Sequence, residues 1–144
     1  MPEKIRAVVI YESLTGNTAR LAELIGTAAR GIGAEVSVFS IDGIGLKELA
    51  AADLVFLGTW VDGLVLFAHR PGRQQKLRRM PVIDGKRVAL FMSYAIHPGK
   101  ALDRFASVAE ERGGTVVARQ LFRRDRLSAG VDDFVEVALA GVPV

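Results

Sequence analysis

The strongest structural signal in this chain lies in residues 5–18, which read IRAVVIYESLTGNT. Residues 5–11 are almost all apolar and β-favouring, which is typical of a strand buried on both faces within a parallel sheet. From Thr18 to Arg30 the apolar side chains recur with helical spacing. The six residues from Ser13 to Thr18 contain three hydroxyl side chains, a glycine and an asparagine. The sequence therefore predicts a strand, a polar loop and a helix N-terminus in direct succession.

Strands and helices continue to alternate along the rest of the chain. Further strands are expected at residues 34–40, 53–58, 87–93 and 115–122, and further helices at 46–52, 73–80, 99–112 and 131–140. A loop rich in Gly and Pro is expected over residues 59–72. This alternation predicts an α/β sandwich with helices on both faces of a parallel sheet. Ligands of such sheets bind beyond the carboxyl ends of the strands, so we expect the site in the loops after strands one, three and four.

Length and composition indicate a single domain over residues 1–144, since half of the residues are apolar and 24% are charged. The chain contains no cysteine and two histidines. Disulfides, thiolate metal sites and a cysteine nucleophile are thereby excluded, and the ligands for a multi-histidine metal site are lacking. The N-terminus is charged and the apolar runs are short, so we expect a cytoplasmic protein without an integral membrane segment.

The formal net charge is +3, and the basic residues gather in residues 69–87 and 119–126. Such clusters attract acidic proteins, nucleic acid or anionic lipid, or they simply form a solvated face. Nucleic acid is disfavoured because the cluster at 69–87 has no aromatic side chains on which bases could stack. If the basic residues serve binding, the sequence favours a protein partner with an acidic surface.

The polar loop at residues 13–18 has the composition of a phosphate site. Backbone N–H groups at a helix N-terminus are unpaired and carry the positive end of the helix dipole, and hydroxyl groups beside them add neutral donors. The loop has no lysine or arginine, and it matches neither the triphosphatase loop nor the dinucleotide fingerprint. The alternative is that Thr15, Asn17 or Thr18 only caps the helix.

At this loop the sequence resembles the flavodoxin family, whose phosphate loop is Ser/Thr-x-Thr-Gly-x-Thr after the first strand. The resemblance implies a short-chain, flavodoxin-like three-layer sandwich with a five-stranded parallel sheet of order 2-1-3-4-5, and FMN as the cofactor. The residues that would surround the FMN phosphate are Ser13, Leu14, Thr15, Gly16, Asn17 and Thr18.

The loop after the third strand adds an aromatic side chain. Trp60 offers a flat surface on which a flavin ring can stack, or it packs in the core. Thr59 with Trp60, and Asp62 with Gly63, resemble the family's pattern at this loop. Val61 departs from that pattern, because the family has glycine there, and a β-branched residue makes positive φ costly.

The loop after the fourth strand contains Ser93, Tyr94, Ala95 and His97. Tyr94 is the candidate for stacking on the outer face of the flavin, with a place in the core as the alternative. Backbone amides from Ala95 to His97 could meet the pyrimidine edge of the ring. His97 could respond to the charge of the flavin, or it is an exposed loop residue.

The resemblance implies a low-potential, one-electron FMN carrier that serves a redox partner protein. A second hypothesis is an FMN-dependent oxidoreductase acting on a quinone or porphyrin-like substrate, similar to the flavodoxin-like protoporphyrinogen oxidases. A third is a binding domain without flavin. No nucleophile or acid–base pair stands out, so we name no catalytic residue and no metal ligand. The basic composition is expected to make the reduction potential less negative than in acidic flavodoxins.

Overall fold

The computed structural model describes residues 4–13, 16–61, 83–95 and 98–143. Its elements are β1 (Arg6–Tyr11), α1 (Asn17–Gly31), β2 (Glu35–Ser40), the short 3-10 helix η1 (Ile41–Gly43), α2 (Leu46–Ala51), β3 (Leu54–Trp60), β4 (Arg87–Tyr94), α5 (Ala101–Glu111), β5 (Thr115–Arg123) and α6 (Val131–Ala140). The helix predicted at residues 73–80 and most of the loop predicted at 59–72 lie outside the described residues.

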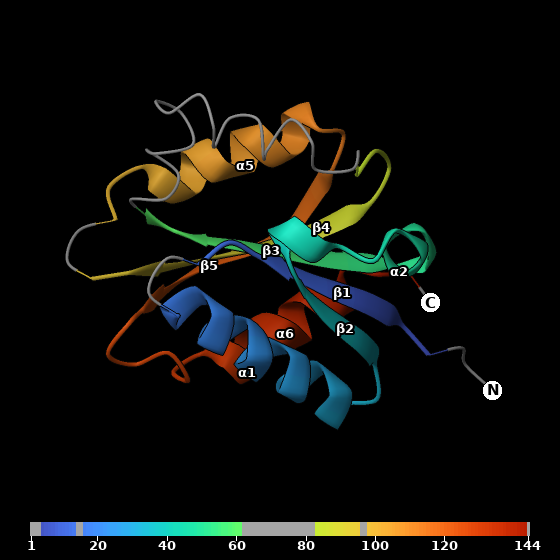
Figure 1. Ribbon diagram of the computed structural model, residues 1–144, viewed down its shortest axis with the longest axis horizontal. Helices are drawn as coiled ribbons and strands as arrows, with labels where there is room; N and C mark the ends of the chain where they lie inside the picture. Colours follow the sequence, from blue (N-terminus) through green and yellow to red (C-terminus); the bar gives the residue numbers. More distant parts are fainter. Residues whose placement is uncertain (1–3, 14–15, 62–82, 96–97, 144) are drawn as a thin grey trace.

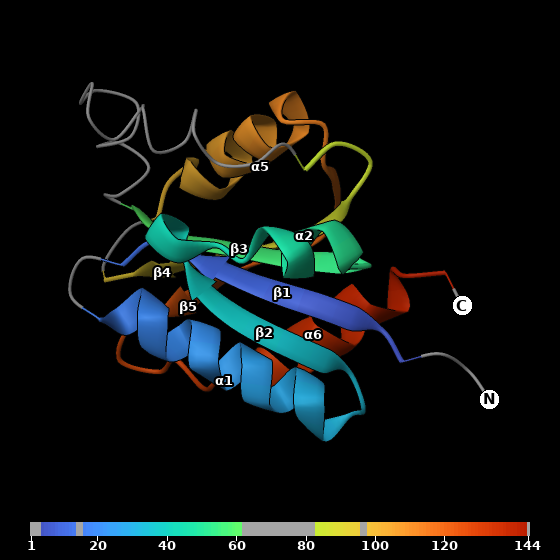
Figure 2. The same cartoon turned by 45° about the vertical axis from the view of Figure 1, so that its right-hand side comes forward.

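The five strands form one parallel sheet of order β2-β1-β3-β4-β5. The predicted α/β class and strand order are thus confirmed. Figure 1 shows α1 and α6 on one face of the sheet and α5 on the other. Figure 2 places α2 on the same face as α5, over β1 and β3. Side chains of each strand therefore alternate between the α1/α6 face and the α2/α5 face.

The core has one cluster on each face of the sheet. Phe134 of α6 makes edge-to-face contacts with Phe56 and Phe122, with ring centroids 5.8 and 5.6 Å apart. Val8 and Ile10 of β1 point to the opposite face and pack with α2 and α5. Burial on both faces explains why the central strands read as continuous apolar runs.

The predicted end of the third strand is wrong. Thr59 and Trp60 were expected to begin a loop, but they are the last residues of β3 and pair in register with Met92 and Ser93 of β4. The strand is prolonged because β4 itself extends to Tyr94 and offers backbone partners that the sequence of β3 alone does not indicate.

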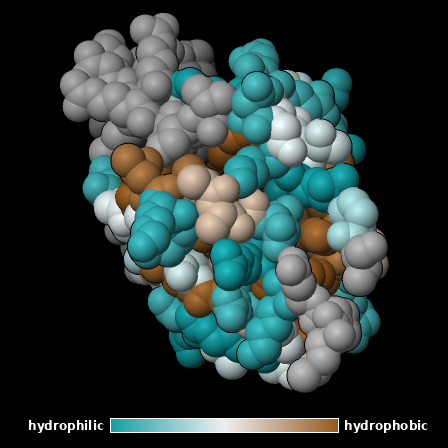
Figure 3. Space-filling model, turned by 90° about the vertical axis from the view of Figure 1, so that its right-hand side faces the viewer, coloured by the Kyte–Doolittle hydropathy of each residue, from teal (hydrophilic) through white to brown (hydrophobic). Residues whose placement is uncertain are grey.

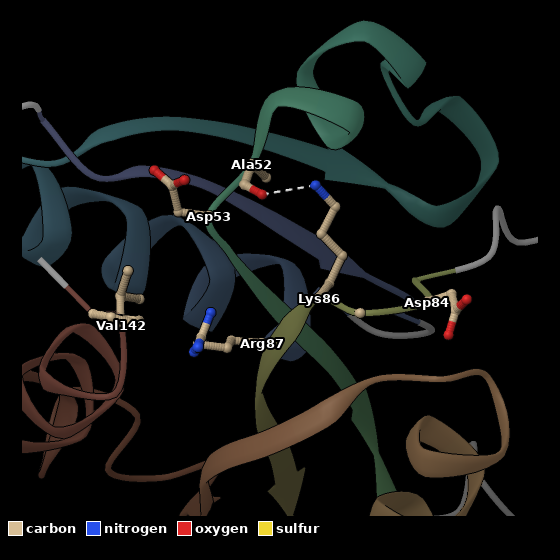
Figure 4. A pocket seen from close by; sticks show the side chains of 8 residues that line it. Ala52, Asp53, Asp84, Lys86, Arg87 and Val142 are labelled. Carbon is tan, nitrogen blue, oxygen red and sulfur yellow. Dashed lines mark hydrogen bonds between the residues drawn. The ribbon is translucent and has the colours of Figure 1, made fainter.

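The amino edge of the sheet carries both ends of the described chain (Figure 1). Seen from this side, the surface is mostly hydrophilic, with apolar side chains in small separate patches (Figure 3). A cavity of about 330 Å³ lies here between the starts of β3 and β4 and the C-terminal residues (Figure 4). Lys86 Nζ donates to the carbonyls of Ala50 and Ala52, at 2.9 and 2.8 Å, so its charge supports the end of α2. Lys86 and Arg87 thus lie at the opposite edge from the predicted site.

Candidate functional site

The strand order reverses between β1 and β3. From β1 the chain passes through α1 to β2 on one side, whereas from β3 it continues to β4 on the other. Open α/β sheets bind ligands beyond the carboxyl ends of the strands at such a reversal. The amide of Glu12 donates to the carbonyl of Gly58 at 3.0 Å and extends the pairing of β1 with β3 by one residue. Glu12 and Thr59 therefore lie at this carboxyl edge.

Gly16 shapes the turn that leads from β1 into α1. It is the N-cap of the helix and has φ +92°, and, apart from its chain neighbours, no described residue has an atom within 4 Å of the position that a Cβ would take. A glycine N-cap has no side chain to accept hydrogen bonds from the first turn. The Ser13 hydroxyl accepts from the Gly16 amide at 3.1 Å, so it stays free to donate its own hydrogen.

The alternative capping role for Asn17 or Thr18 is wrong, because Gly16 occupies the cap position and Asn17 already belongs to the helix. A residue inside the helix cannot adopt the extended backbone of an N-cap residue. Thr15, the third residue proposed for this role, lies outside the described residues.

Buried polar side chains are concentrated at this edge. Within the described part of the chain, the buried polar or charged residues are Glu12, Thr18, Thr59 and Ser93. All four lie at the carboxyl ends of β1, β3 and β4 or in the first turn of α1. Everywhere else in the described interior the side chains are apolar, so the polar groups mark this edge as functional.

These four residues form two groups on opposite faces of the sheet. The hydroxyls of Thr18 and Ser93 lie 2.9 Å apart and hydrogen-bond each other on the α1/α6 face. Glu12 and Thr59 have the strand parity of Ile10 and Leu57, which belong to the cluster on the α2/α5 face. The buried Thr59 hydroxyl has no hydrogen-bond partner among the described residues. Thr18 and Ser93 thus join α1 to β4, whereas Thr59 retains unused hydrogen-bonding capacity.

The remaining described candidates lie at the same carboxyl edge. Trp60 ends β3 and is half-buried, and Val61 follows it and packs against the cluster on the α2/α5 face. Tyr94 ends β4, is half-buried, and accepts a hydrogen bond from the Arg124 amide at 2.9 Å. Ala95 is exposed. Each described residue with positive φ is a glycine, so Val61 has an ordinary backbone conformation.

Five predicted site residues lie outside the described residues, namely Leu14, Thr15, Asp62, Gly63 and His97. One buried residue of this edge, Glu12, was not among the predicted site residues. Its signal was present in the sequence: a charged residue directly follows an apolar strand and directly precedes the polar loop. Such a residue ends the strand on the surface or is buried in a site, and only the structure distinguishes the two.

The residues of this edge fit FMN. The N-terminus of a 15-residue helix, the open turn at Gly16 and the Ser13 hydroxyl are neutral donors suited to a phosphate group. The Thr59 hydroxyl, which no described residue partners, suits a ligand that brings its own polar atoms, and Trp60 suits a flat ring. Among the described residues we find no group of three or more His, Asp or Glu side chains that could hold a metal ion. In the same residues, every helix is too short or too polar to span a membrane.

Comparison with known proteins connects this geometry to a family. The model of the flavodoxin domain matches residues 8–118, which run from within β1 to the first part of β5. The chain belongs to the flavodoxin family. The predicted resemblance is confirmed, and with it the assignment to a family of FMN-containing electron carriers.

Individual flavodoxins are similar over most of their length. The flavodoxin of Megasphaera elsdenii is 28% identical over 109 residues, which cover 76% of this chain and 80% of that protein. The flavodoxin of Clostridium beijerinckii is 28% identical over 128 residues, 89% of this chain and 93% of that protein. The solved structure of a flavodoxin from the domain Archaea superposes with a TM-score of 0.64 at 26% identity and covers 94% of this chain and 97% of that one.

Proposed function

We propose that this chain, as one domain over residues 1–144, is a cytoplasmic FMN-binding electron carrier that exchanges single electrons at low potential with a redox partner protein. The observation that carries the proposal is the gathering of buried polar side chains at the edge where the family's phosphate loop lies. The buried Thr59 hydroxyl has no partner in the described part of the chain, and such a group is costly unless a ligand completes it.

The residues of the loop after β1 would hold the FMN phosphate. The Ser13 hydroxyl and the backbone amides of residues 17 and 18 are uncharged donors, and the helix dipole adds positive potential. Leu14 and Thr15 complete the same loop in the sequence. Thr18 would act indirectly in this arrangement, because its hydroxyl is bonded to Ser93 and holds the first turn of α1 against β4.

The other two loops would hold the flavin ring. FMN, when bound, supplies the redox chemistry, because its ring accepts and releases electrons. Trp60 would stack on the ring and exclude water, with Val61, Asp62 and Gly63 beside it. Tyr94, Ala95 and His97 would contact the outer face and the polar edge of the ring.

The partner is proposed to present an acidic surface. Arg123 ends β5 at the carboxyl edge, Arg124 and Arg126 follow it, and all three are exposed. The backbone of Arg124 is bonded to that of Tyr94. Arg123 is paired with Asp125 at 3.2 Å. Positive charge at the rim of the site would steer a negatively charged partner towards the cofactor.

Titration of the purified apoprotein with FMN tests this function. We expect a flavin absorption spectrum, quenched FMN fluorescence and a higher melting temperature, because a ligand that binds only the native state stabilises it. The same holoprotein is then mixed with a quinone and a nicotinamide donor. An electron carrier turns over slowly by itself, whereas rapid steady-state quinone reduction would favour the oxidoreductase hypothesis. Absence of any FMN binding at saturating concentration would contradict the proposed function.

A further inference from the structure

The buried carboxyl group of Glu12 is the feature of this site that the proposed function leaves without a role. Glu12 is 7% exposed and is the one charged residue among the buried residues that the structure describes. Burying a carboxylate is costly, so its presence in a site is an indication of function. Its neighbours in the sequence are Tyr11 of the sheet and Ser13 of the phosphate loop.

The backbone fixes Glu12 between the two parts of the proposed cofactor site. Its amide donates to the Gly58 carbonyl at 3.0 Å, and Tyr11 is in register with Gly58. Glu12 is therefore the neighbour of Thr59 across the β1–β3 pair, and both have the strand parity of the α2/α5 face. Ser13 of the phosphate loop directly follows Glu12, and Trp60 directly follows Thr59.

A carboxylate in this position would repel the negative charges of a bound cofactor. FMN brings a phosphate group, and its reduction adds further negative charge to the ring. Repulsion between like charges is strong when water is excluded, whereas exposed charges are screened by water and salt. Arg123, Arg124 and Arg126 are exposed, so each would have less influence on a bound cofactor than a buried carboxylate at the same edge.

We propose that Glu12 is the charge-tuning residue of this site: its buried carboxylate beside Thr59 weakens the binding of FMN and lowers the reduction potential of the bound flavin. This inference rests on the proposed function. The negative charge of Glu12 would act against the positive net charge of the chain. That net charge by itself is expected to make the reduction potential of the flavin less negative. The site would thus combine a basic exterior, which attracts a partner, with a negative interior, which keeps the flavin a strong electron donor.

Substitution by glutamine removes the charge and keeps the shape of the side chain. We expect Glu12→Gln to bind FMN about 10-fold more tightly, which corresponds to about 1.4 kcal/mol. Binding of riboflavin, which has the same ring and chain but no phosphate, should change less than about 3-fold, or about 0.6 kcal/mol. The midpoint potential of bound FMN should become less negative.

Glu136→Gln is the matched control, since it removes an equal charge from an exposed position on α6. It should leave the affinity for FMN, the affinity for riboflavin and the potential close to those of the wild type. Glu12→Asp keeps the charge and should retain the wild-type ratio of FMN to riboflavin affinity. Glu12→Ser provides a second neutral variant if Glu12→Gln does not fold, as judged by circular dichroism and thermal unfolding.

Several outcomes would overturn the inference. If Glu12→Gln and Glu12→Ser weaken FMN and riboflavin equally, Glu12 is a hydrogen-bond acceptor for the cofactor chain and its charge is not what matters. If neither variant differs from Glu136→Gln in affinity and potential, the buried charge has no influence on the cofactor. Failure of the wild-type protein to bind FMN at all would instead contradict the proposed function, so the two failures are distinguishable.

Discussion

The hydroxyl groups of Thr18 and Ser93 lie 2.9 Å apart in the interior and join the first turn of α1 to the end of β4. The two residues are separated by 75 positions in the sequence. Each is almost fully buried, with 1% and 3% exposure. The bond fixes the N-terminus of α1 relative to the loop after β4. One contact thus holds together the proposed phosphate site and part of the proposed site for the flavin ring.

Breaking this pair should destabilise the apoprotein. In Thr18→Val the Ser93 hydroxyl is left buried without its partner, which is expected to lower the free energy of unfolding by about 1–3 kcal/mol. The double variant Thr18→Val/Ser93→Ala leaves no unpaired hydroxyl and should recover most of that loss. Urea unfolding of the single and double variants provides the cycle. Additive losses would show that the two hydroxyls do not depend on each other.

The left-handed turn at Gly16 should be intolerant of a side chain even though space is available. Gly16→Ala meets no neighbouring atom, but its φ of +92° strains an L-residue by about 1–2 kcal/mol. We expect lower stability and weaker FMN binding, because the amides of the turn would be displaced. Gly31→Ala is the matched control at the other end of α1, where φ is not positive and space is also open. That variant should be neutral or slightly stabilising in thermal unfolding. Equal effects at Gly16 and Gly31 would exclude backbone strain as the cause.

Removal of the Thr59 hydroxyl should affect stability and binding with opposite signs. In the apoprotein this buried hydroxyl has no partner among the described residues, so Thr59→Val is expected to leave stability unchanged or raise it. FMN binding should weaken by about 1–3 kcal/mol, because a hydrogen bond to the ligand is lost. Thr59→Ser retains the hydroxyl and serves as the control for binding. Parallel losses of stability and affinity in Thr59→Val would mean that the hydroxyl serves the fold.

Charge reversal at the carboxyl edge should slow electron exchange with an acidic partner. Arg124→Glu is expected to reduce the association rate with a small acidic iron–sulfur protein by about 3- to 10-fold at low ionic strength. The difference should shrink as salt is added. Lys4→Glu makes the same change of charge at the exposed amino edge and should have little effect. Stopped-flow mixing measures both rates. An equal reduction by the two variants would indicate that net charge matters and the position of the charge does not.

Much of this fold could be predicted from local sequence. The apolar runs of β1, β3 and β4 predict strands that are buried on both faces, and the helical spacing after Thr18 predicts α1. The predicted range of α6, residues 131–140, agrees with the structure at both ends. These predictions succeeded because periodicity reports which face of an element is buried. The end of β3 could not be predicted in this way, since it depends on the length of β4 beside it.

The sequence by itself determined the alternation of strands and helices and the polar loop from Ser13 to Thr18, because both are encoded in neighbouring residues. Only the tertiary structure decided that the Thr18 hydroxyl bonds to Ser93, that Thr59 has no partner among the described residues, and that Glu12 is buried beside it. The physical reason is that burial and hydrogen bonding of a polar side chain depend on the strand that lies next to it. In a parallel sheet that strand is always distant in the sequence.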